Sequence, residues 1–302
     1  MNQNTLKKEY IFEGKGLHTG LISKMVLCPA PENYGIRFRR VDLGEDAVIP
    51  ALAENVSSTA RSTTISCGAA EVHTVEHILS ALTGLGVDNA IIEIDNAEVP
   101  ILDGSARPYV EAISRDGLRE QFSPRTLVEI PSVVEVKDEK TGSWVRIEPA
   151  RHPQYEITVD FGSRILGVQN AKWDGSEAYL KEIAPCRTFV FFHELEFLAA
   201  NNLIKGGDVE NAIVIVEHPV TQEQLDRMTE LFGQPHLEID EKGYLTNLEL
   251  HFSNECGRHK LLDLIGDLRL GGGFLAAKVT AFKPGHTINT NAARALRALL
   301  AK

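Results

Sequence analysis

Cysteine and long hydrophobic runs are both scarce in this sequence, and each absence excludes a class of protein. The 302 residues include only four cysteines, and Cys28, Cys67, Cys186 and Cys256 form no pair at the spacing of a thiolate zinc finger. We therefore expect no disulfide framework and a reducing compartment. No stretch reaches the roughly 18 apolar residues of a membrane span, and the N-terminal stretch lacks the apolar segment of a signal peptide. The prediction is a cytoplasmic protein without stable membrane insertion.

Positive charge is also in short supply. The sequence has 31 lysines and arginines against 42 aspartates and glutamates, which gives a net charge of −11. A nucleic-acid-binding surface requires a basic stripe, so nucleic acid is not an expected partner. An anionic small molecule is compatible with the sequence only where individual Lys or Arg side chains are placed at its site. The 43% hydrophobic content is sufficient for a packed core.

Strand-like and helix-like segments alternate in both halves of the chain, which predicts an α+β fold. Runs of β-rich residues bounded by Pro, Gly or Asn predict strands at 23–30, 35–42, 88–94, 144–150, 155–161 and 274–282. Helical patterns begin near positions 74, 106 and 258. A polar, proline-containing segment at 120–126 predicts a boundary, which divides the chain into domains 1–123 and 124–302.

Two segments about 180 residues apart share one pattern. Residues 76–94 and 258–282 each have a histidine at the second position, leucine or isoleucine at helical spacing, a glycine-rich stop and a β-rich run. This pattern predicts two similar domains from a duplicated module, each a sheet packed on helices. His77 and His259 would then face a shared seam.

The second of these helices carries a polar stripe. At 100° per residue from His259, Asp263 lies at about 40° and Asp267 at about 80°, whereas the leucines and isoleucines occupy the opposite arc. A solvated helix face is one interpretation of this stripe. A histidine and a carboxylate four residues apart can also reach one metal ion. His77 would complete three ligands, the number typical of a catalytic zinc site with an open position.

Glu76 points away from the adjacent His77, because neighbouring helical residues diverge by about 100°. One interpretation is an ordinary helix start, capped by Thr74, with a solvated acid in its first turn. Beside a zinc site, the same carboxylate is placed as the general base for a water molecule. His286 follows a glycine in a predicted loop and is a candidate acid, which Asp267 could orient and charge.

Several long motifs together resemble the UDP-3-O-acyl-N-acetylglucosamine deacetylase family, the zinc amidases of lipid A biosynthesis. The resemblance extends over essentially the whole chain. The motifs are GKGLHTG, TVEHILSALTGLGVDN, VPILDGSARPY, CRTFVFF, KGGDVENAIV, RHKLLDLIGDL and KPGHTIN. The family fold is similar to the predicted repeat, with two α+β domains and the active site at their interface.

The resemblance implies a zinc cofactor and a set of ligands for it. By position in the matching motifs, His77, His259 and Asp263 correspond to the zinc ligands, and Glu76 corresponds to the general base. The implied reaction is hydrolysis of the acetamide on an acylated UDP-glucosamine, which gives acetate and a free amine.

Other motifs imply supporting catalytic residues. In KPGH, His286 corresponds to the acid and electrostatic stabiliser, and Asp267 pairs with it. In CRTF, Thr188 supplies a hydroxyl that supports the developing oxyanion. Sequence alone leaves open whether one residue or an acid–base pair transfers the protons.

Substrate contacts are implied as well. Lys260 and Lys283 would supply local positive charge for the diphosphate, Phe161 corresponds to an aromatic residue near the uridine, and Phe189 follows Thr188 in the same motif. A βαβ insert at about 188–216 is expected to form an apolar tunnel for the acyl chain, although ordinary core is an equal interpretation for each wall residue. The predicted wall residues are Phe191, Leu195, Val209, Ala212 and Val214.

Three alternatives differ from a single-function deacetylase. A non-catalytic metal- or ligand-binding module would not need Glu76 or His286. A zincin protease would show HExxH on one helix, and this motif is absent from the sequence. The chain could also be the first part of a bifunctional fusion with an acyl-thioester dehydratase. Unless it is fused to such a domain, we expect a monomer whose partner is the small-molecule substrate.

Overall fold

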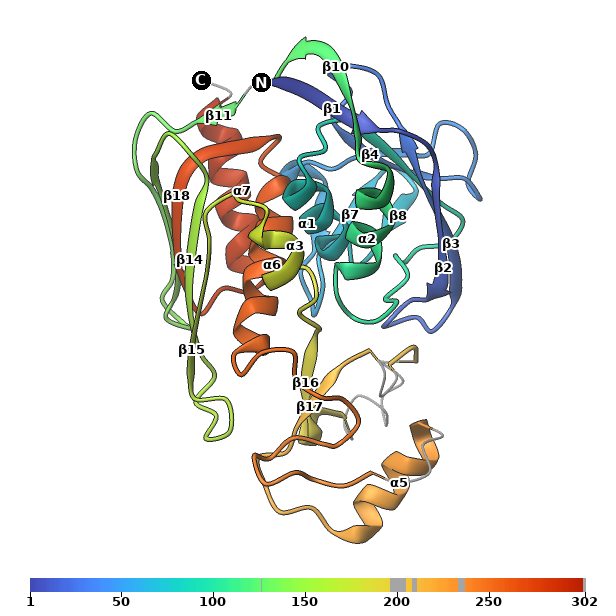
Figure 1. Cartoon of the computed structure of the whole chain (residues 1–302), viewed down its shortest axis with the longest axis vertical. Coiled ribbons are helices and arrows are strands. Elements are labelled where there is room, and N and C mark those ends of the chain that lie inside the picture. The colour runs from blue at the N-terminus through green and yellow to red at the C-terminus, as the bar shows by residue number, and fades with distance from the viewer. Residues whose placement is uncertain (126, 196–204, 208–210, 233–236, 301–302) are drawn as a thin grey trace.

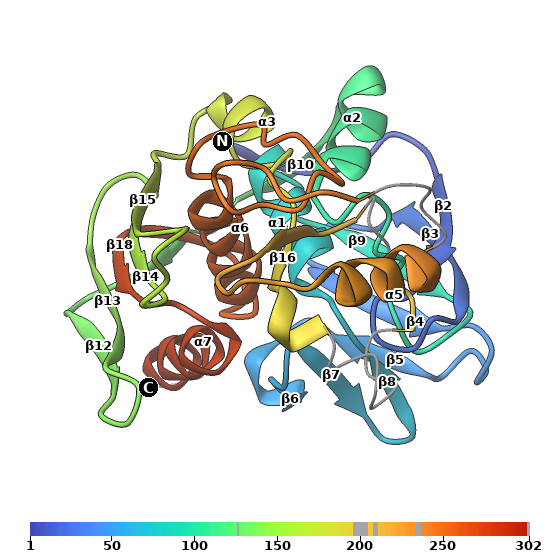
Figure 2. The same ribbon diagram turned by 90° about the horizontal axis from the view of Figure 1, so that it is seen from below.

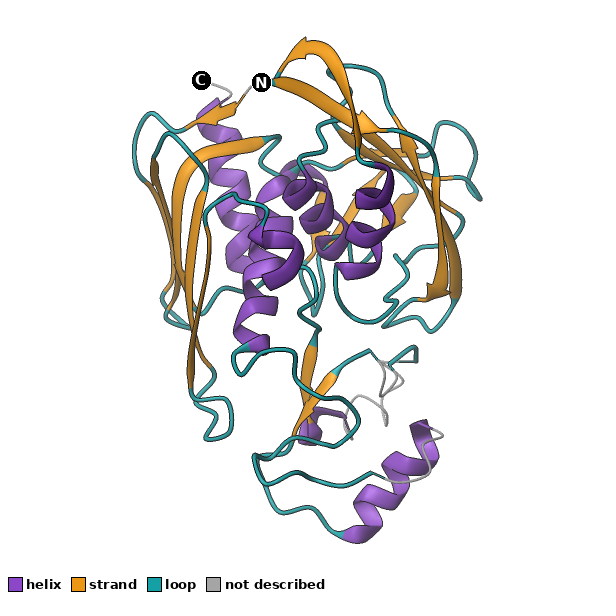
Figure 3. Cartoon of the chain, viewed as in Figure 1, coloured by secondary structure: helices purple, strands orange, loops and turns teal. Residues whose placement is uncertain are grey.

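The computed structural model describes residues 1–125, 127–195, 205–207, 211–232 and 237–300. Within these ranges, two β-sheets enclose a layer of helices, and a smaller lobe lies below them (Figure 1, Figure 3). The mixed α+β class predicted from the sequence is confirmed. None of the helices in these ranges is long and apolar enough to cross a membrane.

The first large sheet comes from the N-terminal part of the chain. Its strand order is β2-β3-β9-β4-β5, and the central strand β9 runs antiparallel to β3 and parallel to β4. Its strands are β2 (Tyr10–Lys15), β3 (Ile22–Pro29), β4 (Ile36–Arg40), β5 (Val48–Pro50) and β9 (Ala90–Ile94). Smaller pairings join β1 (Asn2–Leu6) to β10 (Leu118–Pro124), and β7 (Thr64–Cys67) to both β6 (Val56–Ser58) and β8 (Ala70–Val72).

The second large sheet comes from the C-terminal part. Its order is β12-β13-β18-β14-β15, with β11 also paired to β18. The central strand β18 runs antiparallel to β13 and parallel to β14. The strands are β11 (Leu127–Glu129), β12 (Val134–Asp138), β13 (Ser143–Pro149), β14 (Gln154–Asp160), β15 (Val168–Trp173) and β18 (Phe274–Phe282).

The two sheets share one topology. In each, an antiparallel hairpin flanks one side of the central strand, and a parallel strand followed by an edge strand flanks the other. In each, the helix that directly precedes the central strand packs inside: α1 (Glu76–Leu85) before β9 and α6 (Glu255–Arg269) before β18. The sequence similarity between 76–94 and 258–282 therefore corresponds to the same helix-then-central-strand unit in both sheets.

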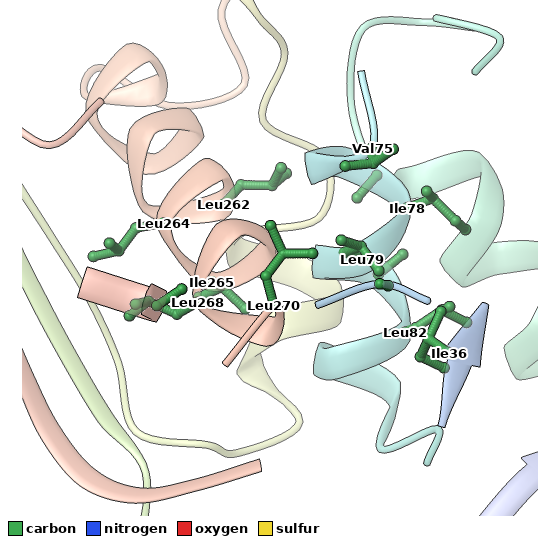
Figure 4. Packing of buried hydrophobic residues seen from close by; sticks show 14 of the residues in the cluster. Ile36, Val75, Ile78, Leu79, Leu82, Leu262, Leu264, Ile265, Leu268 and Leu270 are labelled. Carbon is green, nitrogen blue, oxygen red and sulfur yellow. The ribbon is translucent and has the colours of Figure 1, made fainter. Parts of the chain in front are cut away.

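Helices α1 and α6 pack against each other in the middle of the molecule. Leucine and isoleucine side chains of both helices, with Val75 just before α1, pack where the helices meet, as Figure 4 shows for Leu79, Val75 and Leu262. These residues belong to one hydrophobic cluster that includes side chains from both large sheets. The other helices are α2 (Arg107–Asp116), α3 (Ala178–Glu182), α5 (Gln222–Phe232) and α7 (His286–Leu300), with a short 3-10 turn at Ala53–Asn55.

A glycine allows the close approach of α1 and α6. A Cβ atom on Gly266 would lie 2.0 Å from the carbonyl oxygen of Glu76, a separation that no side chain can occupy. Glycine normally weakens a helix interior by about 1 kcal/mol relative to alanine. At this position it lets the α6 backbone contact the first turn of α1. The polar residues of the two helices are thereby brought together.

Two local predictions are wrong. Thr74 does not cap α1: it has a φ of 61°, and its hydroxyl donates a hydrogen bond to Glu98 at 3.0 Å, while Val75 is the N-cap residue. The buried Glu98 carboxylate thus binds the hydroxyl that would otherwise reach the helix N–H groups.

His286 is not in a loop but is the first residue of α7. Its predicted loop is limited to the residues just before it, where Lys283 has a φ of 50°.

The smaller lobe contains both strands of the segment predicted as a βαβ insert, of which residues 196–204 and 208–210 lie outside the described residues. Strands β16 (Phe189–Phe191) and β17 (Ile213–Ile215) pair in parallel, and α5 lies beyond them. Seen from below, the lobe lies in front of the helix layer and the first sheet (Figure 2). One hydrophobic cluster is confined to the lobe. A second cluster joins β17 to Leu166 and to Cys256 of α6.

Candidate metal centre and its surroundings

Three ligand-type side chains from α1 and α6 converge where the two helices meet. His77 lies in the first turn of α1, and His259 and Asp263 lie one turn apart on α6. The Nε2 atoms of His77 and His259 are 3.6 Å and 3.4 Å from Asp263 Oδ1. The ligand atoms of the three residues all lie within 4.8 Å of one another, and all three side chains are buried. The described part of the chain has no second trio of this kind.

The donor set and its protonation fit a zinc ion. Two imidazole nitrogens and a carboxylate oxygen are typical ligands of catalytic zinc. Asp263 Oδ1 is buried without a hydrogen-bond partner among the described residues, so a cation would satisfy it. Burial lowers the pKa of His259 to about 4, which keeps the imidazole neutral. Burial raises the pKa of Asp263, but His259 and Lys260 outweigh this effect, and the pKa lies well below its usual range.

Two contacts orient the α6 ligands. His259 Nδ1 donates a hydrogen bond to the Cys186 carbonyl oxygen at 3.0 Å. Because a carbonyl only accepts, the proton lies on Nδ1, and Nε2 is free to bind a metal. Lys260 Nζ donates to Asp263 Oδ2 at 2.8 Å, which leaves Oδ1 toward the histidines. The ammonium group that is predicted to contact the diphosphate is thus paired with a candidate metal ligand.

Glu76 is buried beside the trio. Its Oε2 accepts a hydrogen bond from the backbone N–H of Thr63 at 3.0 Å, and its Oε1 lies 3.8 Å from His286 Nε2. Burial raises the pKa of Glu76, although the nearby His286 and His77 offset part of this effect. A carboxylate with a raised pKa is a stronger base, as proton removal from water requires. The geometry of these two adjacent residues is thus compatible with the predicted metal ligand and general base, and both roles stay predictions.

His286 and Asp267 form a second buried pair. His286 Nδ1 donates a hydrogen bond to Asp267 Oδ2 at 3.1 Å. Asp267 also accepts hydrogen bonds from Thr63 Oγ1 at 2.6 Å and Asn289 Nδ2 at 2.9 Å. Burial lowers the pKa of His286, but the Asp267 and Glu76 carboxylates outweigh it and raise the pKa to about 9. His286 is therefore a cation at neutral pH.

The predicted aromatic contacts form a continuous row that starts at His259. The ring of Phe189 lies 6.4 Å from that of His259, 5.4 Å from that of Phe161 and 6.4 Å from that of Phe191, measured between centroids. Phe161 is 41% exposed. An accessible apolar surface therefore begins next to the candidate metal centre.

Lys283 and Thr188 lie along the same row. Lys283 Nζ is 3.6 Å from Asp160 Oδ2, next to Phe161 in the sequence. Thr188 directly precedes Phe189, is half-buried, and its N–H donates to the Gly104 carbonyl at 2.9 Å. Thr188 is thus adjacent to the row along the chain, and Lys283 pairs with the residue before Phe161, while the roles of both residues toward a substrate stay predictions.

The predicted tunnel residues lie in different surroundings. Phe191 belongs to the aromatic row, and Ala212 is half-buried next to β17. Leu195 and Val214 are buried in the hydrophobic cluster of the smaller lobe. Val209 lies outside the described residues. Whether these side chains line a tunnel for an acyl chain stays a prediction.

Sequence reasoning missed three contributors to the centre. Thr63 contacts both Glu76 and Asp267, Asn289 binds Asp267, and the carbonyl of Cys186 fixes the tautomer of His259. Thr63 lies in RSTTIS and Asn289 one turn after His286, so only their closeness to other motifs could have indicated them. The Cys186 contact uses a backbone atom and leaves no signal in residue identity.

Comparisons with known proteins agree on one family. The family model described as UDP-3-O-acyl N-acetylglycosamine deacetylase matches residues 3–232 and 234–298. The chain is 44% identical to the bifunctional enzyme LpxC/FabZ of Porphyromonas gingivalis, over 98% of this chain and 64% of the relative. It is 39% identical to the UDP-3-O-acyl-N-acetylglucosamine deacetylase of Xanthomonas euvesicatoria, over 98% of this chain and 90% of the relative.

A second bifunctional enzyme LpxC/FabZ, from Bacteroides thetaiotaomicron, is 43% identical over 98% of this chain and again 64% of the relative. The chain therefore spans 64% of the length of these two bifunctional relatives.

Proposed function

Because the chain belongs to the UDP-3-O-acyl N-acetylglycosamine deacetylase family, we propose that it hydrolyses the acetamide of UDP-3-O-acyl-N-acetylglucosamine in lipid A biosynthesis. The products are acetate and a free amine. One observation supports this proposal most strongly: a buried zinc-type trio lies directly beside a buried base and a buried cationic histidine. A non-catalytic metal-binding module would need neither Glu76 nor His286.

In this mechanism, His77, His259 and Asp263 would hold zinc. When bound, zinc acts as a Lewis acid that polarises water and the amide carbonyl. Glu76 accepts a proton from the water molecule whose oxygen attacks the acetamide carbon. Its buried position and raised pKa suit this role, and the Thr63 N–H holds one oxygen of its carboxylate in place.

His286 and Thr188 act on the developing negative charge. The cationic imidazole and the Thr188 hydroxyl stabilise the oxyanion of the tetrahedral intermediate. The C–N bond then breaks, and the amine nitrogen receives a proton from His286 or from Glu76. Asp267 holds His286 charged and oriented through the Nδ1 hydrogen bond.

We also propose how the substrate lies. Lys260 and Lys283 contact the diphosphate, Phe161 lies near the uridine and Phe189 continues the surface toward the metal centre. The insert at about 188–216 receives the acyl chain. The aromatic row supports this arrangement because it connects the predicted uridine contact to His259.

The same proposal covers the domain organisation and location of the protein. We divide the chain into domains 1–123 and 124–302 with the active site between them, supported by the shared sheet topology and by the origin of the ligands on α1 and α6. A cytoplasmic location and a monomeric state are proposed with it. The four cysteines, which are all free, are compatible with a reducing compartment.

The test is acetate release from UDP-3-O-acyl-N-acetylglucosamine by the purified chain. We expect activity that is lost when a chelator removes zinc and returns when zinc is added back. Exposed His152 offers a control variant, His152→Ala, which should retain the activity. Zinc binding without acetate release would support a non-catalytic module instead, and acetate release without bound metal would overturn the proposed site.

A further inference from the structure

A buried ion pair links the start of α6 to the segment that contacts the metal centre. Arg187 Nε and Nη2 donate hydrogen bonds to the two carboxylate oxygens of Glu255, at 2.9 Å and 3.1 Å. The backbone N–H of Arg187 also donates to Glu255 Oε1 at 3.1 Å. The side chains of the pair are 7% and 0% exposed. Neither residue has a role in the proposed reaction.

The residues on both sides of Arg187 reach the site. The carbonyl of Cys186 accepts the hydrogen bond from His259 Nδ1, and Thr188 is the proposed oxyanion contact. Glu255 lies one helical turn before His259 on α6. The pair therefore connects the first turn of the helix that carries a ligand to the short segment that orients the same ligand.

We propose that Arg187 and Glu255 are positioning residues that hold the Cys186 carbonyl against His259, and so keep Nε2 of this imidazole directed at the metal. The inference rests on the proposed function, since it concerns the zinc site of the same enzyme. Partners that orient a metal-binding histidine commonly change metal affinity by about 10- to 100-fold when lost.

The ion pair is better placed than strand β16 to fix the position of the Cys186 carbonyl. Cys186 and Arg187 precede β16, so the strand pairing of Phe189 to Phe191 does not include them. A hydrogen bond from the Cys186 N–H to the Ile183 carbonyl, at 3.0 Å, holds the other side of this residue. A bidentate arginine–carboxylate contact fixes both distance and orientation, which a single hydrogen bond does not.

A second arginine offers a matched control. Arg125 Nε and Nη2 donate to the two oxygens of Asp88 at 2.8 Å and 2.6 Å, and these side chains are 9% and 11% exposed. Each arginine also binds one backbone carbonyl, of Gly86 for Arg125 and of Glu249 for Arg187. Arg269, the last residue of α6, donates to the Asp88 carbonyl, so this second pair lies near the other end of the helix.

The experiment measures zinc affinity by chelator competition, and the visible spectrum of the cobalt-substituted protein, for wild type, Arg187→Met and Arg125→Met. We expect Arg187→Met to bind zinc about 10- to 100-fold more weakly and to show an altered cobalt spectrum. Arg125→Met should lose thermal stability but keep wild-type affinity and spectrum. A general loss of stability alone would therefore not reproduce the result.

Two outcomes would overturn the inference: wild-type zinc affinity and spectrum in Arg187→Met, or an equal loss in Arg125→Met. If Arg187→Met fails to fold, Arg187→Lys is compared with Arg125→Lys in its place, because lysine keeps the charge but loses the bidentate contact. Acetate release by wild type is recorded separately. If wild type released no acetate, the proposed function would be contradicted, but the zinc affinities would still test the inference.

Discussion

Helices α1 and α6 occupy equivalent places under sheets of the same strand order, yet they supply different chemistry. In α1, the two side chains placed at the candidate metal centre are those of the first two residues, Glu76 and His77. In α6, it extends over three turns, through His259, Asp263 and Asp267. The shared topology brings both helices to one place, and the position of polar residues along each helix determines what each one supplies.

This difference leaves each helix incomplete by itself. Helix α1 carries one candidate ligand and the proposed base, whereas α6 carries two candidate ligands and the hydrogen-bond partner of His286. In the described part of the chain, the proposed three-ligand site and its neighbouring base therefore come together where the two helices meet, near the Gly266–Glu76 contact. The predictions below test this division of roles, from the largest expected effect to the smallest.

Removing a ligand from either helix should abolish zinc binding. We expect His77→Ala and His259→Ala to bind no zinc at micromolar concentration and to lose acetate release, because two ligands hold zinc far less tightly than three. Metal content after dialysis and the deacetylation rate are the measurements. Retention of zinc by His77→Ala would show that α6 binds the ion without α1.

Removing the base should reduce turnover while zinc stays bound. For Glu76→Gln we expect the deacetylation rate to fall about 10²- to 10⁴-fold, the usual contribution of a general base. Zinc content should equal that of wild type, since Glu76 is not a ligand. A variant that loses zinc together with activity would instead make Glu76 part of the metal site.

His286 should have a somewhat smaller effect, again without loss of zinc. We expect His286→Gln to lower the deacetylation rate about 10²- to 10³-fold, as loss of an oxyanion-stabilising group does. The comparison of its rate with that of Glu76→Gln shows which side chain is more important. Unchanged turnover in His286→Gln would remove this residue from the mechanism.

The charge of His286 should set the alkaline limit of activity. With its pKa raised to about 9, its cationic form is lost, and the deacetylation rate falls, as the pH rises through about 9. Asp267→Asn removes the main cause of this increase, so the alkaline limit of the pH–rate profile should move to lower pH. If the alkaline limit of Asp267→Asn stays at the wild-type pH, a group other than His286 sets it.

The same raised pKa has a consequence for stability. The folded state binds the proton more tightly than the unfolded chain, whose histidine titrates near 6.5. This contribution to the free energy of unfolding is therefore complete below pH 6.5 and is lost as the pH rises through about 9. Chemical denaturation of wild type and Asp267→Asn between pH 6 and 10 measures it, and parallel curves would contradict it.

The contact between the helices gives the smallest prediction. In Gly266→Ala, the added methyl group would meet the Glu76 carbonyl, so α1 and α6 must separate. We expect the free energy of unfolding to fall by about 1–3 kcal/mol, typical of overpacking, instead of the gain that alanine usually gives in a helix. Urea denaturation measures it, and a more stable variant would contradict the close contact.

Sequence periodicity is sufficient to predict the polar stripe on α6 and the similar helix-then-strand segments at 76–94 and 258–282. His259, Asp263 and Asp267 lie on one face because helical geometry requires it. The shared pattern at 76–94 indicates His77, which lies beside His259 and Asp263, and its role as the third ligand stays a prediction. The Thr74 cap was wrong because a distant carboxylate, Glu98, binds the hydroxyl. Long-range competition of this kind is not encoded in local spacing.

Contacts through backbone atoms were beyond sequence reasoning for a similar reason. The Cys186 carbonyl and the Thr63 N–H orient His259 and Glu76, but any residue provides a carbonyl, and any residue other than proline an N–H. The Arg187–Glu255 pair joins residues 68 positions apart, and neither belongs to a spacing pattern. Tertiary structure is required to recognise such partners.

The most direct test of the central claim is an anomalous-diffraction map at the zinc absorption edge, from crystals of the zinc-loaded protein. We predict one strong peak, bounded by the Nε2 atoms of His77 and His259 and by the Asp263 carboxylate, with Glu76 beside the peak but not bonded to it. A peak bound by α6 residues alone, or one located away from the α1–α6 contact, would contradict the account.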